Sequence, residues 1–229
     1  MTDKLTASVV LVIALATGLA GRGLLAAERV SHEQAVAEIL KLGGRVTGLD
    51  LSYERVTDAW LKHVEGLTQL QTLRVRYAQV TDAGLVHLRG LTQLQTLDLS
   101  FTKVTDAGLK RLTGLVQLQT LHLWDTQVSD AGLEHLKGLS QLRELYLSGS
   151  KITSAGLEHI KGLTQLRTLD LARTDVADAG LEHLKGLVRL ESVDVEDTRV
   201  GDAGLEELSR ALPKLYIKPR LVPAVPKAK

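Results

Sequence analysis

The sequence predicts an α/β solenoid, in which copies of one short unit stack side by side around a shared core. Three observations carry this prediction. Leucine fills 46 of the 229 positions, whereas Trp, Tyr and Phe together fill only seven. Within a 24-residue unit, apolar residues first alternate and then recur three apart, as in a strand followed by a helix. Six glycines stand 24 residues apart without an insertion, namely Gly66, Gly90, Gly114, Gly138, Gly162 and Gly186.

The unit is best read from Leu94, where it runs LQTLDLSFTKVTDAGLKRLTGLVQ. Leu97 and Leu99 flank Asp98 as strand residues do, and Leu109 and Leu112 share a helix face. One such unit cannot bury its leucines alone, so the copies must stack to form a core. Copies begin at Val46, Leu70, Leu94, Leu118, Leu142, Leu166 and Leu190.

Two further columns mark the start of each helix. An Asp or Ser precedes the helical half of every copy and predicts an N-cap. A Gly follows two residues later in six copies, which predicts a close approach between neighbouring helices, as at Gly132. Trp60 takes the glycine position in the first copy. The capping column is Asp58, Asp82, Asp106, Asp130, Ser154, Asp178 and Asp202.

The sequence also predicts how the repeat domain, residues 45–217, is closed at each end. Residues 28–44 hold a Ser, a Gln three positions on and a Gly-Gly stop, which predict an N-terminal capping helix with Trp60 packed beneath it. Seven repeats are followed by a truncated last strand, in which Leu215 and Ile217 align with Val193 and Val195 at a spacing of 22 residues. Residues 218–229 are predicted to be a disordered, basic, proline-rich tail.

The N-terminus, residues 1–27, is predicted to be a targeting segment. Its apolar run from Leu5 to Ala20 is about 16 residues long, which is short against the roughly 20 residues that span a bilayer. Small residues follow the run, as in a secretory signal peptide. We therefore expect a secreted or periplasmic protein. The alternative is an N-terminal membrane anchor, which would be the chain's only contact with a membrane.

Composition and charge exclude several classes of function. With no Cys, disulfides and thiolate metal sites are absent, and we assign no metal and no cofactor. Residues 28–217 hold 22 basic and 26 acidic residues, a net charge of −4. A nucleic-acid partner needs a clustered excess of positive charge, so none is expected.

The repeat resembles a known family. Leu94-x-x-Leu97-x-Leu99-x-x-Thr102-x-Val104 matches the leucine-rich-repeat pattern. The sequel resembles the helical, cysteine-containing subclass of ribonuclease-inhibitor and F-box-type arrays, with Thr in the Cys position. The array is also similar to those of exported bacterial leucine-rich-repeat proteins. The resemblance implies a right-handed horseshoe with a concave parallel sheet and convex α-helices, which binds a protein or peptide rather than catalysing a reaction.

The outward strand positions supply the candidate binding residues. Since equivalent positions of stacked repeats lie side by side, aromatic residues of the first five repeats are expected to form a strip on the concave face. The alternative is that the aromatics only cover the turn beneath them. The predicted strip is Tyr53, Tyr77, Phe101, His122, Trp124 and Tyr146. A secondary acidic patch is Asp170, Asp194, Glu196 and Asp197, which fits a basic partner, weak Ca²⁺ binding or a solvated face.

These observations predict a non-enzymatic, exported module that binds a protein or peptide through its concave face. One alternative is a structural or self-associating spacer in a bacterial envelope. A lesser alternative is a glycan-binding or hydrolase-like site at Asp98, His122 and Ser100, although an open sheet offers no oxyanion site. The oligomeric state stays open. The column of His63, His87, His135, His159 and His183 lies on the convex helices, too far apart to share a metal ion.

Overall fold

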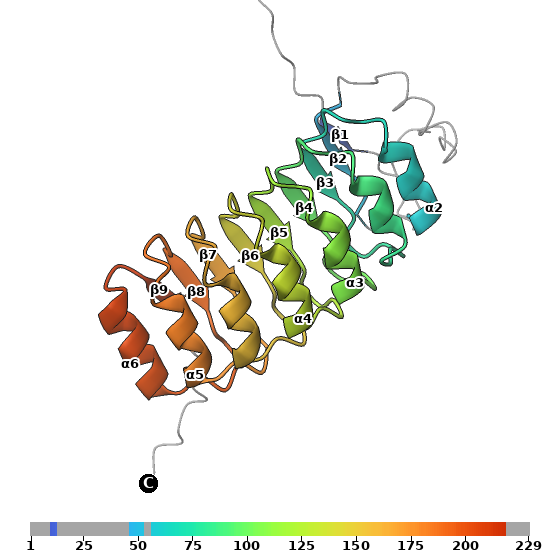
Figure 1. Cartoon of the computed structure of the whole chain (residues 1–229). Helices are drawn as coiled ribbons and strands as arrows, with labels where there is room; N and C mark the ends of the chain where they lie inside the picture. Colours follow the sequence, from blue (N-terminus) through green and yellow to red (C-terminus); the bar gives the residue numbers. More distant parts are fainter. Residues whose placement is uncertain (1–9, 13–45, 53–55, 219–229) are drawn as a thin grey trace, which may run out of the picture.

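The computed structural model describes residues 10–12, 46–52 and 56–218, and it confirms the α/β solenoid. A single parallel sheet runs in sequence order along the array (Figure 1). Neighbouring strands from β2 onward pair at an offset of 24 residues, as in Leu73 beside Leu97 and Leu97 beside Leu121. The strands are β1 (Val10–Val12), β2 (Gly48–Asp50), β3 (Thr72–Arg74), β4 (Thr96–Asp98), β5 (Thr120–His122), β6 (Glu144–Tyr146), β7 (Thr168–Asp170), β8 (Ser192–Asp194) and β9 (Tyr216–Lys218).

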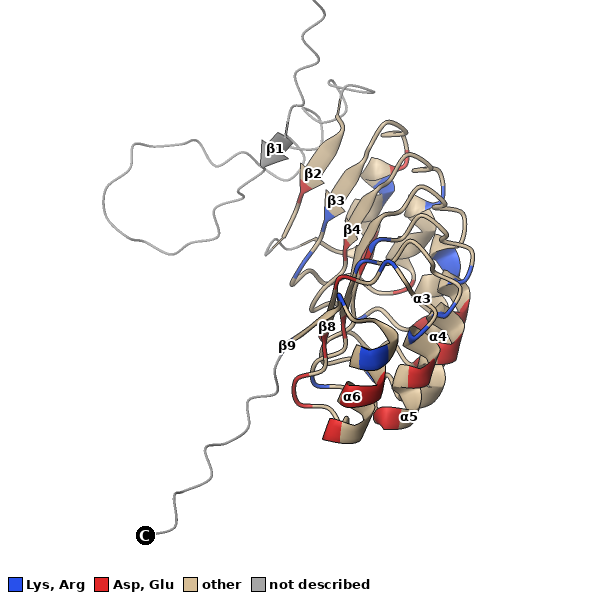
Figure 2. Cartoon of the chain, turned by 90° about the vertical axis from the view of Figure 1, so that its left-hand side faces the viewer, with Lys and Arg blue, Asp and Glu red and all other residues tan. Residues whose placement is uncertain are grey.

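The helical halves of the repeats lie on the opposite side of the array from the sheet (Figure 2). Most are one α-turn continued by one 3₁₀ turn, because a 24-residue unit leaves little chain for a longer helix. The α-helices are α2 (Asp58–Leu61), α3 (Asp106–Leu109), α4 (Asp130–Leu133), α5 (Asp178–Leu181) and α6 (Asp202–Ala211). The 3₁₀ helices are η2 (Lys62–Val64), η3 (Gly84–Leu88), η4 (Lys110–Leu112), η5 (Glu134–Leu136), η6 (Ser154–Ile160) and η7 (Glu182–Leu184).

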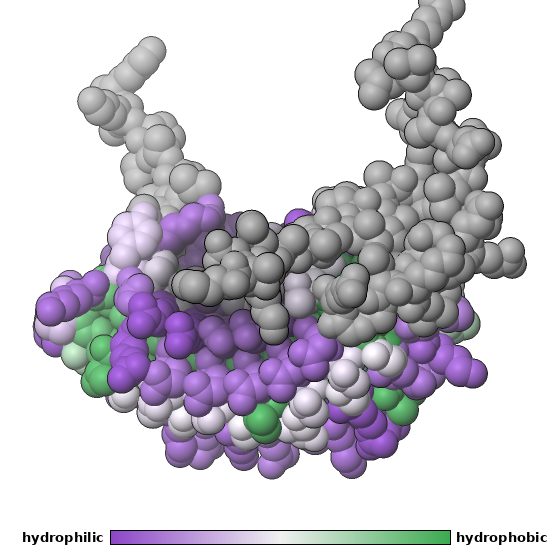
Figure 3. Space-filling view, turned by 90° about the horizontal axis from the view of Figure 1, so that it is seen from above, coloured by the Kyte–Doolittle hydropathy of each residue, from purple (hydrophilic) through white to green (hydrophobic). Residues whose placement is uncertain are grey.

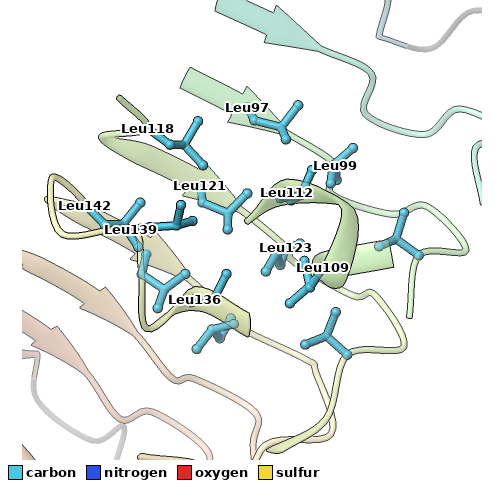
Figure 4. Close-up of a cluster of buried hydrophobic side chains, with 14 of the residues drawn as sticks. Leu97, Leu99, Leu109, Leu112, Leu118, Leu121, Leu123, Leu136, Leu139 and Leu142 are labelled. Atoms are coloured by element: carbon cyan, nitrogen blue, oxygen red, sulfur yellow. The ribbon is translucent and has the colours of Figure 1, made fainter. Parts of the chain in front are cut away.

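One continuous core fills the space between sheet and helices, from Val46 to Leu212. In the repeat around β4, Leu97, Leu99, Leu109 and Leu112 are all fully buried. Leucines of adjacent repeats pack against one another across the repeat boundary (Figure 4). The strand and helix periods read from the sequence therefore select the buried faces correctly.

The aspartate column has a different role from the predicted N-cap. Thr105 holds the extended N-cap position, and Asp106 is the first residue of α3. The residue before the aspartate is likewise the N-cap of α2, α4, α5 and α6. The Asp106 carboxylate reaches the next repeat, where it accepts hydrogen bonds from the Ser129 backbone N–H (2.7 Å) and from Ser129 Oγ (2.6 Å). The N-cap prediction is wrong because the chain enters the helix one residue earlier.

The same contact recurs along the convex side. We call it the aspartate ladder, made by Asp58 with Thr81, Asp82 with Thr105, Asp106 with Ser129 and Asp130 with Thr153. Where Ser154 replaces the aspartate, the facing N-cap Ala177 has no hydroxyl, and only its backbone N–H donates, to Ser154 Oγ at 2.9 Å. In the next repeat Asp178 keeps the carboxylate, which accepts the backbone N–H of the facing N-cap Gly201 at 2.6 Å.

The glycine column makes room for the aspartate ladder. A Cβ placed on Gly132 would collide with the Asp106 carboxylate and lie 3.0 Å from Val128 Cγ1. The predicted close approach is confirmed at this position, but the closest neighbour is the carboxylate of the preceding repeat. The aspartate of one repeat and the glycine of the next therefore act together to join adjacent repeats.

The threonine column closes the turn after each strand. Thr102 Oγ1 donates a hydrogen bond of 2.6 Å to the Leu99 carbonyl oxygen, and Thr126 Oγ1 donates one of 2.8 Å to that of Leu123. Thr174 and Thr198 repeat the contact with Leu171 and Val195. These hydroxyls satisfy backbone groups and carry no chemistry of their own.

The last strand corrects the sequence alignment. Val193 pairs with Ile217 and Asp194 with Lys218, so the 24-residue offset persists and the predicted offset of 22 is wrong. A slip of two residues keeps every side chain on the same face of the sheet, which is why the burial pattern alone did not reveal it. Lys218 consequently belongs to β9 rather than to the tail.

The remaining N-terminal and C-terminal predictions fall largely outside the described residues. These include the capping helix of residues 28–44, the tail beyond Lys218 and most of residues 1–27. Within the predicted signal segment, β1 pairs in parallel with β2, with Leu11 beside Leu49. In the described part of the chain, no helix has the length and apolar character needed to cross a bilayer.

Candidate functional site

Each strand of the sheet is followed by a tight turn, and these turns form a row along one margin of the solvent-facing side. The residue that leaves each turn has a left-handed backbone, as at Tyr77 (φ 56°), Phe101 (φ 58°) and Asp125 (φ 47°). Such a conformation is uncommon for residues other than glycine, and only Gly149 of this row is one. The turns therefore hold large side chains along one margin of the sheet at the cost of local backbone strain.

Two groups of aromatic side chains lie on this face. Tyr77 and Phe101 stack with ring centroids 4.2 Å apart and planes 8° from parallel. His122 and Tyr146 stack at 4.3 Å, and Trp124 meets both edge-on at 5.9 and 5.6 Å. We call these five residues the aromatic strip.

Arg76 links the two groups. Its guanidinium carbon lies 5.6 Å from the centroid of the Tyr77 ring and 5.9 Å from that of the Trp124 ring. Its Nε lies 3.6 Å from Asp98 Oδ2, and Asp98 is only 5% exposed. Arg76 thus contacts one ring of each group. It joins the Tyr77–Phe101 pair to the group of His122, Trp124 and Tyr146.

Among the predicted strip residues, Tyr53 lies outside the described part of the chain, and the other five come together. Tyr77 is 44% exposed, while Phe101, His122, Trp124 and Tyr146 are half-buried. The stacking of Tyr77 on Phe101 matches the alternative that these residues lean on each other at the strand end. Both rings nevertheless remain on the solvent-facing side and outside the core cluster.

Burial and charge shift the titration of three residues beside the strip. Burial lowers the pKa of the His122 imidazole below its usual range, against the attraction of Asp98 and Glu144. Burial, together with the Glu144 carboxylate that accepts the phenol hydrogen bond, raises the pKa of Tyr146 to about 12. Burial likewise raises the pKa of Asp170. At neutral pH, His122 is uncharged and Tyr146 remains a hydrogen-bond donor.

Trp124 connects the strip to the acidic patch. Its indole Nε1–H donates a hydrogen bond of 2.9 Å to Asp170 Oδ2, two repeats further on. The other Asp170 oxygen accepts the Ala172 backbone N–H at 3.0 Å. The indole is therefore held in one orientation, with its ring presented to the surface of the sheet.

The acidic patch forms one wall of a hollow of about 440 Å³ on this face. Phe101 and Trp124 line the other wall. Lys218 enters the acidic side, where its Nζ lies 2.7 Å from Asp194 Oδ2 and 2.8 Å from Glu196 Oε2. We call this space the concave hollow. Viewed from above, strongly hydrophilic residues cover much of the visible surface of the described array (Figure 3).

The hydrolase-like set of Asp98, His122 and Ser100 is not assembled in the described structure. Ser100 is fully buried, and its Oγ has no hydrogen-bond partner among the described residues. Asp98 accepts the Ser100 backbone N–H at 2.9 Å and is paired with Arg76 instead of orienting His122. A nucleophile must reach both its base and its substrate, and Ser100 reaches neither.

Metal-ligating geometry is likewise not found in the described residues, where no three His, Asp or Glu side chains converge. The convex His column sits among surface pairs, as where His87 Nδ1 contacts Glu65 Oε1 at 2.5 Å. The acidic patch therefore offers isolated carboxylates instead of a coordination shell.

Sequence reasoning missed three charged residues at this site. Arg76 and Arg173 are not among the predicted site residues, and Lys218 belongs to β9 instead of the predicted tail. Arg173 donates a hydrogen bond of 2.9 Å to Asp125 Oδ2 across two repeats. Arg76 pairs with Asp98 of another column, and Arg173 reaches past a whole repeat within its own column. A comparison of adjacent equivalent residues therefore does not find these partners.

The geometry defines the class of protein, a repeat solenoid with an open parallel sheet, which presents an extended surface for partners. A family model for the leucine-rich repeat region matches residues 40–228, and the chain belongs to the leucine-rich repeat family. The assignment to the cysteine-containing subclass stays a prediction. No curated protein matches the chain by sequence.

Solved structures give the same fold. An internalin of Listeria monocytogenes, inlF, is similar with 25% identity and a TM-score of 0.65, over 76% of this chain and 47% of that one. Internalin C2 (inlC2) of the same organism is similar with 29% identity and a TM-score of 0.63, over 76% of this chain and 70% of that one. This chain thus spans about half the length of the first of these internalins.

Proposed function

We propose that this protein is an exported, non-enzymatic module that binds a protein or peptide through the aromatic strip. The proposal rests on one observation: aromatic residues that do not belong to the hydrophobic core contact one another ring to ring. Of the seven Trp, Tyr and Phe residues of the chain, four lie together with His122 on one open face. Aromatic side chains concentrate binding energy at protein interfaces, because they bury much area at little cost in conformational entropy.

Two further features support a binding role over a catalytic one. The leucine-rich-repeat solenoid is an architecture whose broad sheet face suits partner binding. Two polar groups of the strip are paired with neighbouring carboxylates, Trp124 with Asp170 and Tyr146 with Glu144. Such pairs hold the rings in place and leave no activated nucleophile.

We expect the combined change Trp124→Ala and Phe101→Ala to weaken partner binding at least about tenfold, or 1.4 kcal/mol. Both residues lie outside the buried core cluster, so the circular dichroism spectrum and the melting temperature should stay near those of the wild type. The partner is first captured with the wild-type protein from the native envelope fraction and identified. Its dissociation constant is then measured for each variant by titration calorimetry.

The matched control is Glu134→Ala with Glu158→Ala on the convex side, where both carboxylates are exposed and pair only with Lys137 and Lys161. It should leave the dissociation constant unchanged. Weaker binding by this control, together with normal binding by the aromatic variant, would move the interface to the convex helices. Sedimentation over a range of protein concentrations tests the envelope-spacer alternative, because a self-associating chain gains mass as concentration rises.

Export is proposed on the N-terminal sequence. The apolar run ends near Ala20 and is followed by Gly21 and by Ala26-Ala27, which are small residues of the kind that signal peptidases accept. We expect N-terminal sequencing of the native protein to find a start between Gly21 and Val30. A start at Met1 in the membrane fraction would favour the N-terminal anchor instead.

A further inference from the structure

The concave hollow has two chemically different walls. Phe101 and Trp124 form the aromatic wall, and Asp170, Asp194, Glu196 and Asp197 form the acidic wall. The cations that line the hollow are Arg173 and Lys218, so its lining carries two net negative charges when every group is ionised. Arg173 is already paired with Asp125. The hollow therefore favours a positively charged occupant with an apolar portion.

The acidic wall is strained by like charges in the absence of a partner. Asp170 and Asp194 are directly opposite each other on the adjacent strands β7 and β8. Like charges at such positions destabilise a sheet. A cation placed between them would relieve this repulsion.

The chain itself shows which kind of cation the acidic wall accepts. The Lys218 ammonium lies within hydrogen-bond distance of both Asp194 and Glu196, at 2.7 and 2.8 Å. Hydrogen bonds to Asp194, and to a lesser extent to Glu196, hold the pKa of the Lys218 ammonium above its usual range. Among the described residues, the salt bridges of Lys218 reach only Asp194 and Glu196 and leave Asp170 and Asp197 for another cation.

The aromatic wall also accepts cations. The Arg76 guanidinium lies over the Trp124 ring at 5.9 Å, within the range of a cation–π contact. The hydrogen bond from Trp124 to Asp170 fixes the indole beside the acidic wall. A lysine or arginine side chain can thus lay its apolar stem along the ring while its charged end reaches the carboxylates.

We propose that the concave hollow is the subsite for a lysine or arginine side chain of the partner protein, held between Trp124 and the acidic wall. The proposal rests on the proposed function and adds the chemical class of the segment that is bound. A metal ion is a poorer occupant, because no three potential ligands converge in the described part of the array. Lys218 acts as an internal cation that competes for the same carboxylates.

The experiment uses the mature protein and a defined probe. The probe is the synthetic peptide acetyl-Gly-Lys-Gly-Lys-Gly-Lys-Gly-amide, and its counterpart carries norleucine in place of lysine. Binding is measured by titration calorimetry at low ionic strength and again in 0.3 M salt. We expect the lysine peptide to bind, the norleucine peptide to bind at least about fivefold more weakly, and salt to weaken the lysine peptide.

Two variants change the subsite in opposite directions. Glu196→Gln with Asp197→Asn removes two carboxylates and keeps a residue that tolerates the left-handed backbone at position 197 (φ 53°), so the lysine peptide should bind about fivefold more weakly. Lys218→Gln removes the internal competitor, so the same peptide should bind about threefold more tightly. The control Glu134→Gln with Glu158→Gln makes the same change in net charge on the convex side and should have no effect.

Three outcomes would overturn the cationic subsite. They are equal binding of the two peptides, an unchanged affinity in the Glu196–Asp197 variant, and a convex control that weakens binding as much as that variant does. Each leaves the proposed function intact if capture of the native partner still depends on Trp124 and Phe101. Conversely, the lysine peptide could bind as expected while capture of the native partner does not depend on Trp124. In that case the proposed function would be wrong and the cationic subsite would stand.

Discussion

Valine at position 132 should lower the free energy of unfolding by about 3 kcal/mol, even though valine favours helices more than glycine does. Any side chain on Gly132 collides with the Asp106 carboxylate and crowds Val128. To make room, Asp106 must leave Ser129, which breaks two hydrogen bonds that join adjacent repeats. Urea unfolding followed by circular dichroism measures the change in free energy.

A glycine from another column provides the control. A Cβ on Gly138 meets nothing within 4 Å, so Gly138→Val should change the free energy of unfolding by about 0.5 kcal/mol or less. Equal losses at the two positions would mean that valine is costly even where a Cβ has room, and the packing explanation for Gly132→Val would then fail.

Alanine at position 106 should lower the free energy of unfolding by about 2 kcal/mol, because it leaves the part-buried Ser129 N–H and hydroxyl without their acceptor. Beyond this loss, Asp106→Ala also removes the atom that excludes a side chain at position 132. The cost of Gly132→Ala should consequently be smaller in the Asp106→Ala background than in the wild type, by at least about 0.5 kcal/mol.

This double-mutant cycle tests whether Asp106 and Gly132 act as one device. Gly138→Ala in the same Asp106→Ala background is the matched control and should be additive, because Gly138 has no close neighbour. If the losses in unfolding free energy at Asp106 and Gly132 are additive, the two residues act independently. The Asp106 carboxylate would then not explain why position 132 is a glycine.

The sequence alone predicted the fold and the face that carries the candidate site. A strict 24-residue period, with alternation in one half and three-residue spacing in the other, identifies strands, helices and buried columns, because equivalent residues of stacked repeats must be neighbours. The same reasoning placed Tyr77, Phe101, His122, Trp124 and Tyr146 on the outward side of the sheet. Alternation places His122, Trp124 and Tyr146 outward. Tyr77 and Phe101 follow the buried leucines at even spacing, and they face outward because the chain turns there through a left-handed residue.

Only the tertiary structure decided which columns touch one another. Asp106 bonds a residue 23 positions away, Trp124 one 46 positions away and Arg173 one 48 positions away. The first two contacts join different columns, and the third joins two residues of one column across an intervening repeat. The pairing of adjacent equivalent residues therefore does not predict them. The pairing of Lys218 with Asp194, and the burial of Asp98 and Ser100, likewise depend on the strand register and on how far long side chains reach. Periodicity determines a residue's face and its equivalent neighbours, whereas its hydrogen-bond partners depend on side-chain length and direction in three dimensions.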